Sequence, residues 1–299
     1  MAFRSVIISE PCSLKVKDSQ LFVLQDDGKV AIPLEDIAAV ILESNQILLS
    51  SSLLSIFSDN GIALYTCDSK HLPCSVALPF LPHSRQSGIF KLHMGISQPF
   101  KKRIWQQVIV AKISNQAKCL ELLNKTGAKK LKNMADAVNS GDSDNMESQA
   151  AASYFESLFP GIRRRCNNRI NSALDYGYSI LRGAMARALV AHGFYPPLGI
   201  FHRNELNEYN LADDFMEPYR PFIDIHVALN LPEDNNLSKD DRAALVAILH
   251  NDCQMENEIY SVLYSIEMTA ASFLSAIKGN EVKLLKLPQL LIPASHELE

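Results

Sequence analysis

The stretch Pro99-Phe-Lys-Lys-Arg-Ile-Trp-Gln-Gln-Val-Ile-Val-Ala-Lys-Ile-Ser-Asn-Gln-Ala117 marks a change in the pattern of the chain. Its apolar residues recur at helical spacing, at Ile104, Val108, Ala111, Ile113 and Ala117. This spacing predicts one long amphipathic helix. Short apolar runs typical of strands precede the stretch, and helical patterns follow it. The sequence therefore predicts an α+β fold, with a small β-rich N-terminal domain followed by a larger all-α domain.

The β-rich region consists of short β-branched or apolar runs separated by turn signals such as Asp18-Ser19 and Asp59-Asn60-Gly61. The predicted strands are Ser5–Ser9, Leu14–Val16, Leu21–Leu24, Val30–Leu34, Ala38–Leu42 and Ile62–Cys67. One short helix, at about Ser51–Ser58, interrupts them. We expect a β-rich domain over residues 1–82, a linker over 83–98 and a helical domain over 99–299.

Four further helices are predicted after the first long one. They span Ile170–His192, Leu211–Leu229, Asp240–Asn251 and Asn257–Lys278. Pro218 and Pro221 should break or kink the second of these.

Composition excludes several classes of protein. The chain has 299 residues, of which 47% are hydrophobic, as in a soluble globular protein. No apolar run reaches the roughly 18 residues that a membrane span needs, and the N-terminus lacks a signal-peptide pattern. The six cysteines lie far apart without a CxxC pair, so we expect free thiols in a reducing cytoplasm.

Positive charge is concentrated although the whole chain has a net charge of −4. Between Arg85 and Lys132 there are eleven Lys or Arg residues and one acid, Glu121, which gives this stretch a charge of +10. A second basic cluster is Arg163-Arg164-Arg165 with Arg169. These clusters fit a polyanion site on one face, and they equally fit solvated helix surfaces.

Glu147 begins the apolar face of a further predicted helix. It shares that face with Ala150, Ala151, Tyr154, Phe155 and Leu158. Asp144-x-x-Glu147 also resembles a capping box, with Asp144 as the N-cap. On an apolar face a carboxylate needs a cation or a strong donor, so Glu147 is either a cap residue or part of a site.

A histidine and several acids follow the Pro196-Pro197 break. His202 ends an apolar run, and Asp213, Asp214 and Glu217 crowd one flank of the next helix. Helix-dipole complementarity explains acids in a first turn without any function, and a lone histidine is commonly only hydrogen-bonded. Together, however, oxygen ligands and one imidazole suit Mg²⁺ or Mn²⁺. The usual P-loop, dinucleotide, GxSxG and HExxH motifs are absent.

Four ordered segments between residues 147 and 221 resemble the CRISPR-associated integrase family, the nuclease of the spacer-acquisition module. They are Glu147-Ser-Gln-Ala-Ala-Ala-Ser-Tyr-Phe155, Asn171-Ser-Ala-Leu-Asp-Tyr-Gly-Tyr-Ser-Ile-Leu-Arg182, Gly193-Phe-Tyr-Pro-Pro-Leu-Gly-Ile-Phe-His-Arg203 and Asn210-Leu-Ala-Asp-Asp-Phe-Met-Glu-Pro-Tyr-Arg-Pro221. With the β-rich region before them, the resemblance covers essentially the whole chain, and the wording of the first and last segments is similar to type II members. Phe201 and Ser148 depart from the histidine and glycine that some members have there.

The resemblance implies a β-rich domain that mediates homodimerisation and an α-helical catalytic domain that uses Mg²⁺ or Mn²⁺. Its metal ligands would be Glu147 and His202 with a third acid. Glu217 matches the type II pattern best, Asp214 takes the place of the aspartate in other branches, and Asp213 is a further candidate.

The implied activity is the insertion of short DNA duplexes into a CRISPR repeat array, by 3′-hydroxyl attack on a phosphodiester, together with endonuclease activity. The implied partners are double-stranded DNA, a second copy of the chain and a small ferredoxin-like protein, with no membrane. Candidate DNA-binding residues are Lys101, Lys102, Arg103, Arg163, Arg164, Arg165, Arg169, Tyr176 and Arg203.

Two other functions remain open at this point. The chain could be an inert DNA-binding scaffold in which Glu147 only caps its helix, or a related integrase of a mobile element. Trp105, the single tryptophan, lies beside the basic cluster and could stack on a base, although core packing is favoured.

Overall fold

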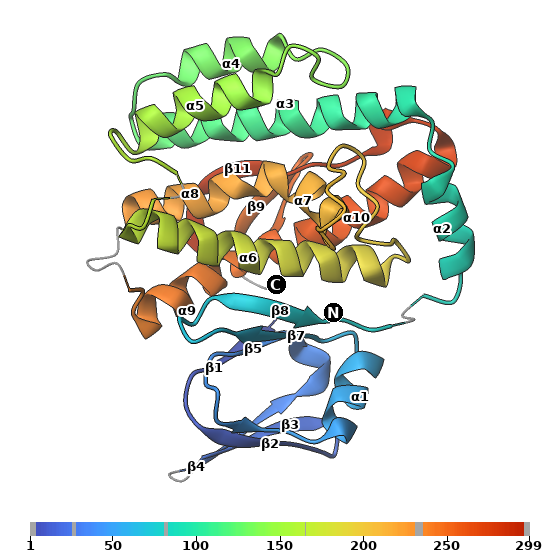
Figure 1. Cartoon of the computed structure of the whole chain (residues 1–299), viewed down its shortest axis with the longest axis vertical. Coiled ribbons are helices and arrows are strands. Elements are labelled where there is room, and N and C mark those ends of the chain that lie inside the picture. Colours follow the sequence, from blue (N-terminus) through green and yellow to red (C-terminus); the bar gives the residue numbers. More distant parts are fainter. Residues whose placement is uncertain (1–3, 26–27, 81–82, 165, 231–235, 296–299) are drawn as a thin grey trace.

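The structure is a computed structural model that describes residues 4–25, 28–80, 83–164, 166–230 and 236–295 (Figure 1). Two four-stranded sheets and one helix make up its N-terminal part. Helices and a third, three-stranded sheet make up the rest. None of the helices in the described ranges is both long and apolar enough to span a membrane.

The N-terminal sheets contain all six predicted strands and two more. The first has the order β1-β5-β7-β8, with β1 (Arg4–Ile8), β5 (Ile37–Leu42), β7 (Ala63–Cys67) and β8 (Pro73–Ala77). The second has the order β4-β3-β2-β6, with β2 (Cys12–Lys17), β3 (Gln20–Gln25), β4 (Gly28–Pro33) and β6 (Ile47–Leu48). Helix α1 (Ser51–Asp59) lies between β6 and β7 in the chain, close to its predicted bounds.

The first sheet lies between two hydrophobic cores. Every residue of its strand β5 is buried. Ala39 and Ile41 belong to the large core of the helical part, whereas Val40 and Leu42 belong to the small core between the two sheets. Alternate side chains of one strand therefore tie the N-terminal part to the helical part.

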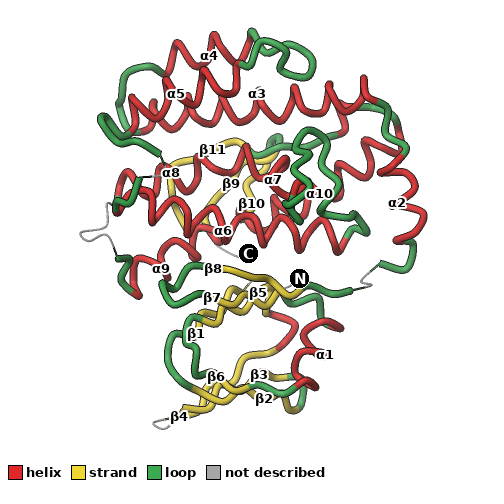
Figure 2. The backbone as a smooth tube through the Cα atoms, viewed as in Figure 1, coloured by secondary structure: helices red, strands yellow, loops and turns green. Residues whose placement is uncertain are grey.

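The helices are α2 (Gln86–Met94), α3 (Gln98–Leu122), α4 (Ala128–Asp136), α5 (Met146–Leu158), α6 (Arg169–Ala191), α7 (Asn210–Met216), α8 (Arg220–Leu229), α9 (Lys239–Ala247) and α10 (Val262–Gly279). Short 3₁₀ turns span Leu34–Asp36, Glu217–Tyr219, Ile248–His250 and Val282–Leu284. In Figure 2, α3, α4 and α5 form an outer layer, and α6 runs between that layer and the N-terminal sheets. The two prolines break the predicted Leu211–Leu229 helix into α7, a 3₁₀ turn and α8.

Helix α6 packs directly on strand β7. A Cβ atom at Gly183 would lie 2.2 Å from the ring of Tyr65, so only glycine permits this approach. The Tyr65 hydroxyl donates a hydrogen bond to the carbonyl of Ile180 at 3.3 Å. The contact positions α6 on the first sheet.

The expectation of an all-α C-terminal part is wrong. Strands β9 (Asn251–Met255), β10 (Glu258–Ser261) and β11 (Gln289–Ser295) form a sheet of order β10-β9-β11. Strands β9 and β10 are short and polar, so they lack the alternation that predicts a strand, and β10 continues directly into the periodic pattern of α10. The segment 83–98, expected as a linker, contains helix α2.

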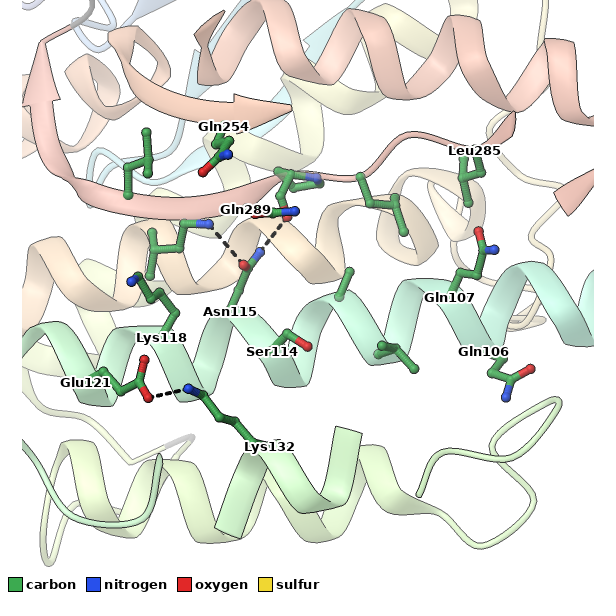
Figure 3. A pocket seen from close by; sticks show the side chains of 16 residues that line it. Gln106, Gln107, Ser114, Asn115, Lys118, Glu121, Lys132, Gln254, Leu285 and Gln289 are labelled. Atoms are coloured by element: carbon green, nitrogen blue, oxygen red, sulfur yellow. Dashed lines mark hydrogen bonds and ion pairs between the residues drawn. The ribbon is translucent and has the colours of Figure 1, made fainter. Parts of the chain in front are cut away.

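Strand β11 is held against α3 by one buried amide. The Asn115 side chain accepts a hydrogen bond from the backbone of Leu290 and donates to the carbonyls of Pro218 and Pro288. Figure 3 shows this side chain at a groove between α3 and β11, with the Lys132–Glu121 ion pair at its edge. The groove is lined mainly by polar and aliphatic side chains, and none of the predicted catalytic residues is among them.

Candidate active site

A buried lysine joins two of the predicted site carboxylates. Lys112, near the middle of α3, forms ion pairs with Glu147 on α5 and with Glu217, its ammonium nitrogen lying 2.5 Å from Glu217 Oε2. The lysine side chain is 7% exposed. Burial alone would lower the pKa of Lys112, but the two carboxylates raise it more, so the side chain remains an ammonium ion.

Glu147 does not cap its own helix, so the predicted capping box is wrong. The N-cap residue is Asn145, and Glu147 is the second residue of α5. The Asp142 carboxylate caps the helix instead, since it accepts hydrogen bonds from the backbone of Met146 at 2.8 Å and of Glu147 at 3.1 Å. Positive φ angles at Gly141, Asp142 and Asn145 turn the loop so that Asp142 reaches this position. The Glu147 carboxylate is therefore free to point toward Lys112.

Glu217 is a buried, ionised carboxylate between two cations. Arg220 donates to its Oε1 at 2.9 Å, and Lys112 approaches its Oε2. Burial would raise the pKa of Glu217, but the charges of Arg220 and Lys112 outweigh burial and lower that pKa to about 2. Among the described residues, Oε2 has no hydrogen-bond partner of good geometry despite the short contact with Lys112.

His202 is held by a fully buried aspartate. Asp214 Oδ1 lies 2.7 Å from His202 Nδ1. The same carboxylate accepts hydrogen bonds from the backbone of Ile200, Phe201 and His202 at 2.5, 3.1 and 3.1 Å. The hydrogen bond with Asp214 raises the pKa of His202 against the opposing effect of burial.

The turn around Asp214 depends on Gly199. A Cβ atom there would lie 2.2 Å from the carbonyl oxygen of His202 and 3.0 Å from Asp214 Oδ2. The turn can therefore close only around a glycine. As a result Nδ1 of His202 faces Asp214, and Nε2 points away from that carboxylate.

Asp213 takes part in a different set of contacts. Its carboxylate accepts two hydrogen bonds from Arg182, at 2.7 and 3.1 Å, and one from Asn207 at 2.7 Å. The structure thus brings Glu147 and Glu217 together at Lys112, places His202 on Asp214, and turns Asp213 toward Arg182.

A buried carboxylate beneath the site connects three helices. Asp224 of α8 accepts hydrogen bonds from the hydroxyls of Tyr154 on α5 and Tyr178 on α6. The Arg220 guanidinium lies 4.5 Å from the centre of the Tyr178 ring. Burial raises the pKa of Asp224 to about 6, although the two tyrosine hydroxyls oppose the shift.

The candidate DNA-binding residues occupy different environments. Lys102, Arg103, Arg163 and Arg203 are exposed, while Lys101 and Arg169 are half-buried. Arg164 forms an ion pair with Asp175 at 2.8 Å. Tyr176 is completely buried and donates to the Glu43 carboxylate at 3.0 Å, so it does not reach the surface. Arg165 lies outside the described residues.

Sequence reasoning missed Lys112, Asp142, Arg220 and Asp224. Only Lys112 had a readable signal, because it follows Val108 and Ile109 by four and three residues on the apolar face of α3. A charged residue at such a position requires a partner. The other three roles depend on loop geometry or on contacts between distant segments.

The donor chemistry fits a divalent cation. Two carboxylates already share one cation, the Lys112 ammonium, and a buried Glu217 oxygen lacks a well-oriented partner. Within the described ranges, no three His, Cys, Asp or Glu side chains are gathered closely enough to hold a metal with Lys112 in its present position. The ammonium ion occupies the place between the carboxylates that a metal ion would share.

Comparison with known proteins gives consistent matches. The family model described as CRISPR associated protein Cas1 matches residues 6–257. The CRISPR-associated endonuclease Cas1 of Neisseria meningitidis serogroup C (strain 8013) is 40% identical over 305 residues, which cover 100% of both chains. A CRISPR-associated endonuclease Cas1 of Francisella tularensis subsp. novicida (strain U112) is 27% identical over 77% of this chain and 79% of its own.

Solved structures share the fold. A Cas1 protein from Thermotoga maritima has a TM-score of 0.72 at 16% identity, covering 92% of this chain and 97% of its own. A casposase bound to integration product has a TM-score of 0.73 at 15% identity, covering 94% and 91%. A chain of a Cas6-RT-Cas1–Cas2 complex has a TM-score of 0.72 at 18% identity, covering 95% of this chain and 36% of its own.

Proposed function

The chain belongs to the Cas1 family of CRISPR-associated proteins, and we propose that Glu147, His202 and Glu217 form the active site of this endonuclease and integrase. The observation that carries the assignment is that Glu147 and Glu217 both form ion pairs with Lys112. Asp142 caps α5, so the Glu147 carboxylate is free to take part in this contact. These residues come from α5 and the 3₁₀ turn before α8, with His202 from the loop before α7.

Glu217 is the better third ligand than Asp214. Both Asp214 oxygens already accept hydrogen bonds, four in all, from residues 200–202. Asp214 therefore positions His202: if Nδ1–H donates to its carboxylate, Nε2 keeps the lone pair that binds a metal. Glu217 has an oxygen without a well-oriented partner, whereas Asp213 is engaged by Arg182.

A bound Mg²⁺ or Mn²⁺ would polarise the phosphodiester and lower the pKa of the attacking hydroxyl group. The residues of the chain supply the rest. Glu147, Glu217 and His202 hold the cation, Asp214 orients the imidazole, and Arg220 fixes the Glu217 carboxylate from the buried side. Lys112 must leave the space between the carboxylates, and its ammonium ion is then available to a phosphate oxygen.

The substrate we propose is a short DNA duplex whose 3′-hydroxyl attacks a phosphodiester at a CRISPR repeat. Partnership with DNA and with another Cas protein is supported by the likeness to an integration complex and to a Cas1–Cas2 assembly. We also propose that the N-terminal β-rich part mediates a homodimer, that the second Cas protein is small and ferredoxin-like, and that the system is of type II. The position of Glu217 within Leu-Ala-Asp-Asp-Phe-Met-Glu-Pro motivates the last of these assignments.

The inert scaffold is a second candidate, favoured by the internal neutralisation of the carboxylates by Lys112. Strand transfer distinguishes the two. The assay joins a short duplex with free 3′-hydroxyls to a supercoiled plasmid that carries the repeat array. The reaction contains Mn²⁺ and the proposed small Cas partner protein. We expect Glu147→Ala and His202→Ala to lose at least a hundredfold in joined product, since each removes a ligand.

Glu156→Ala is the matched control, because Glu156 is an exposed glutamate on the same helix. This variant should join DNA at the wild-type rate. Normal transfer by Glu147→Ala would refute the assigned active site, and no transfer by wild type, with DNA still bound, would favour the scaffold.

A further inference from the structure

The turn that carries Glu217 is held at two points by a segment near the C-terminal end of the described chain. The turn spans Glu217–Tyr219, and all three of its residues are buried. The segment that holds it is Lys286–Leu290, which leads into strand β11. We name this segment the C-terminal clamp. It is distant from the turn in the sequence, so only the folded chain brings the two together.

Asn115 makes the first connection between the turn and the C-terminal clamp. It lies on α3 and is 3% exposed. Its side-chain nitrogen donates to the carbonyl of Pro218 at 2.8 Å and to the carbonyl of Pro288 at 3.0 Å. Its oxygen accepts a hydrogen bond from the backbone of Leu290 at 3.0 Å (Figure 3). Both amide hydrogens are therefore used, one on the residue after Glu217 and one on the C-terminal clamp.

Thr269 of α10 makes the second connection. Its hydroxyl donates to the carbonyl of Lys286 at 3.0 Å, so its oxygen accepts from the hydroxyl of Tyr219, which lies 2.8 Å away. Thr269 and Tyr219 are both completely buried. Ser272, one turn further along α10, accepts from the backbone of Lys286 at 3.0 Å. A chain of buried hydrogen bonds thus leads from Tyr219 to the C-terminal clamp.

These contacts fix the backbone next to Glu217, whereas Arg220 fixes its carboxylate. Pro218 is held through its carbonyl and Tyr219 through its hydroxyl, so the turn cannot shift without breaking a buried hydrogen bond. A buried network in which each group has its partner specifies one arrangement. The Glu217 side chain therefore starts from a fixed point and brings its Oε2 to Lys112.

We propose that the C-terminal clamp, acting through Asn115 and Thr269, positions the Glu217 carboxylate for a divalent cation. This inference rests on the proposed function and deepens it, because it makes the end of the chain part of the support of the active site. Asn115, Thr269 and Tyr219 are positioning residues, since they act through the backbone of the turn. Groups behind a metal ligand set how tightly that ligand binds, and their loss typically costs about 10–100-fold in metal affinity.

The test is a calorimetric titration of the full chain with Mn²⁺ alone, well below the melting temperature. Tyr219→Phe keeps the ring and removes the hydrogen bond to Thr269, so we expect the Mn²⁺ dissociation constant to rise about tenfold. Thr269→Val has nearly the same shape without the hydroxyl and should lose as much. Thr269→Ser keeps the hydroxyl and should bind Mn²⁺ as wild type does. Asn115→Ala removes the other connection and should also weaken binding; if it fails to fold, the two hydroxyl variants still decide.

Tyr65→Phe is the matched control for Tyr219→Phe. Tyr65 is also a buried tyrosine, and its hydroxyl donates to one acceptor, the carbonyl of Ile180, outside the site. This variant should lose a comparable hydrogen bond and keep the Mn²⁺ affinity of wild type. Strand transfer adds a second readout, because Tyr219→Phe should be slower than wild type at limiting Mn²⁺ and should recover when Mn²⁺ is saturating.

Mn²⁺ binding by wild type with unchanged affinity in Tyr219→Phe and Thr269→Val would overturn the inference and leave the proposed function standing. An equal loss of affinity in Tyr65→Phe would also overturn it, since the effect would then be one of general stability. Wild type that binds no Mn²⁺, with or without DNA, would remove the proposed metal site itself and the inference with it.

Discussion

At the residue scale, Lys112 holds the two carboxylates of the candidate site together. Two glutamates that face each other in a largely buried space repel, and the ammonium ion between them offsets that repulsion. In the proposed function a metal ion would take the same carboxylates with higher charge, so the lysine and the metal would compete for one place. The lysine would then stabilise the metal-free protein and oppose metal binding.

We expect Lys112→Met to lower the free energy of unfolding by about 1.5–3 kcal/mol in chelator, since Glu147 loses its cation and Glu217 keeps only Arg220. Mn²⁺ should then raise the melting temperature more in this variant than in wild type, because metal binding to the folded state stabilises it. Thermal denaturation with and without Mn²⁺ measures both effects. Lys118→Met, an exposed lysine of the same helix, is the control. An Mn²⁺ shift in Lys112→Met no larger than the wild-type shift would contradict the competition.

At this scale the sequence indicated which residues are candidate ligands but not how each carboxylate is held. The apolar face beginning at Glu147 and the acid cluster ending at Glu217 were visible as patterns. The cap residue was assigned wrongly, because three residues with positive φ redirect the loop and bring Asp142 into place of Asp144. The sequence favoured Glu217 over Asp214 only through the resemblance, and the contacts of Asp214 with residues 200–202 add a physical argument for the same preference.

At the scale of elements, Asp224 fixes the packing of α5, α6 and α8 beneath the site. Its carboxylate accepts from tyrosines on the two other helices. Burial raises the pKa of Asp224 to about 6, above the value of an unfolded aspartate. The folded state therefore binds more protons than the unfolded state between about pH 4 and 6, and stability should fall as pH rises through that range.

Asp224→Asn should remove this pH dependence, because the amide does not titrate and can still bond both tyrosine hydroxyls. Relative to the variant, wild type should lose about 2 kcal/mol of unfolding free energy between pH 4 and pH 7. Urea unfolding across this range provides the measurement. The exposed Asp136→Asn should unfold as wild type throughout. A constant difference between wild type and Asp224→Asn would show that Asp224 does not change protonation on folding.

Elements with a clear apolar pattern were predictable, and strands without one were not. The long helix α6 lies within one residue of its predicted bounds, since its spacing extends over many turns. Strand β11 pairs with β9 across more than thirty residues of sequence, and no local pattern contains that pairing. Strand β6 has only two residues and pairs with the distant β2. Strand β8 forms a hairpin with β7, but it begins with Pro73 and has no buried residue, so it lacks the apolar alternation that predicts a strand.

At the scale of the whole molecule, a buried ion pair joins the N-terminal sheets to the helical part. Glu43, directly after β5, accepts hydrogen bonds from Arg242 of α9 at 2.7 and 3.1 Å and from the Tyr176 hydroxyl of α6. Ser9 donates to the same carboxylate at 2.8 Å. Burial opposes ionisation, but Arg242 and the hydroxyl donors lower the pKa of Glu43. Because of this cluster and the shared first sheet, we expect the two parts to unfold as one cooperative unit.

Arg242→Met should destabilise the whole chain, because it leaves the Glu43 carboxylate buried without its cation. We expect a loss of about 3–5 kcal/mol in urea unfolding at pH 7, in a single transition. The matched control is Lys239→Met. Lys239 joins the same helix to Glu10 at 3.3 Å, but both side chains are more than half exposed, and such pairs contribute only about 0–1 kcal/mol.

In Glu43→Gln/Arg242→Met, which has no charge to bury, much of the loss should be recovered. Equal losses in Arg242→Met and Lys239→Met would place the connection between the two parts in the apolar core alone, and two separate transitions would show that the parts unfold independently.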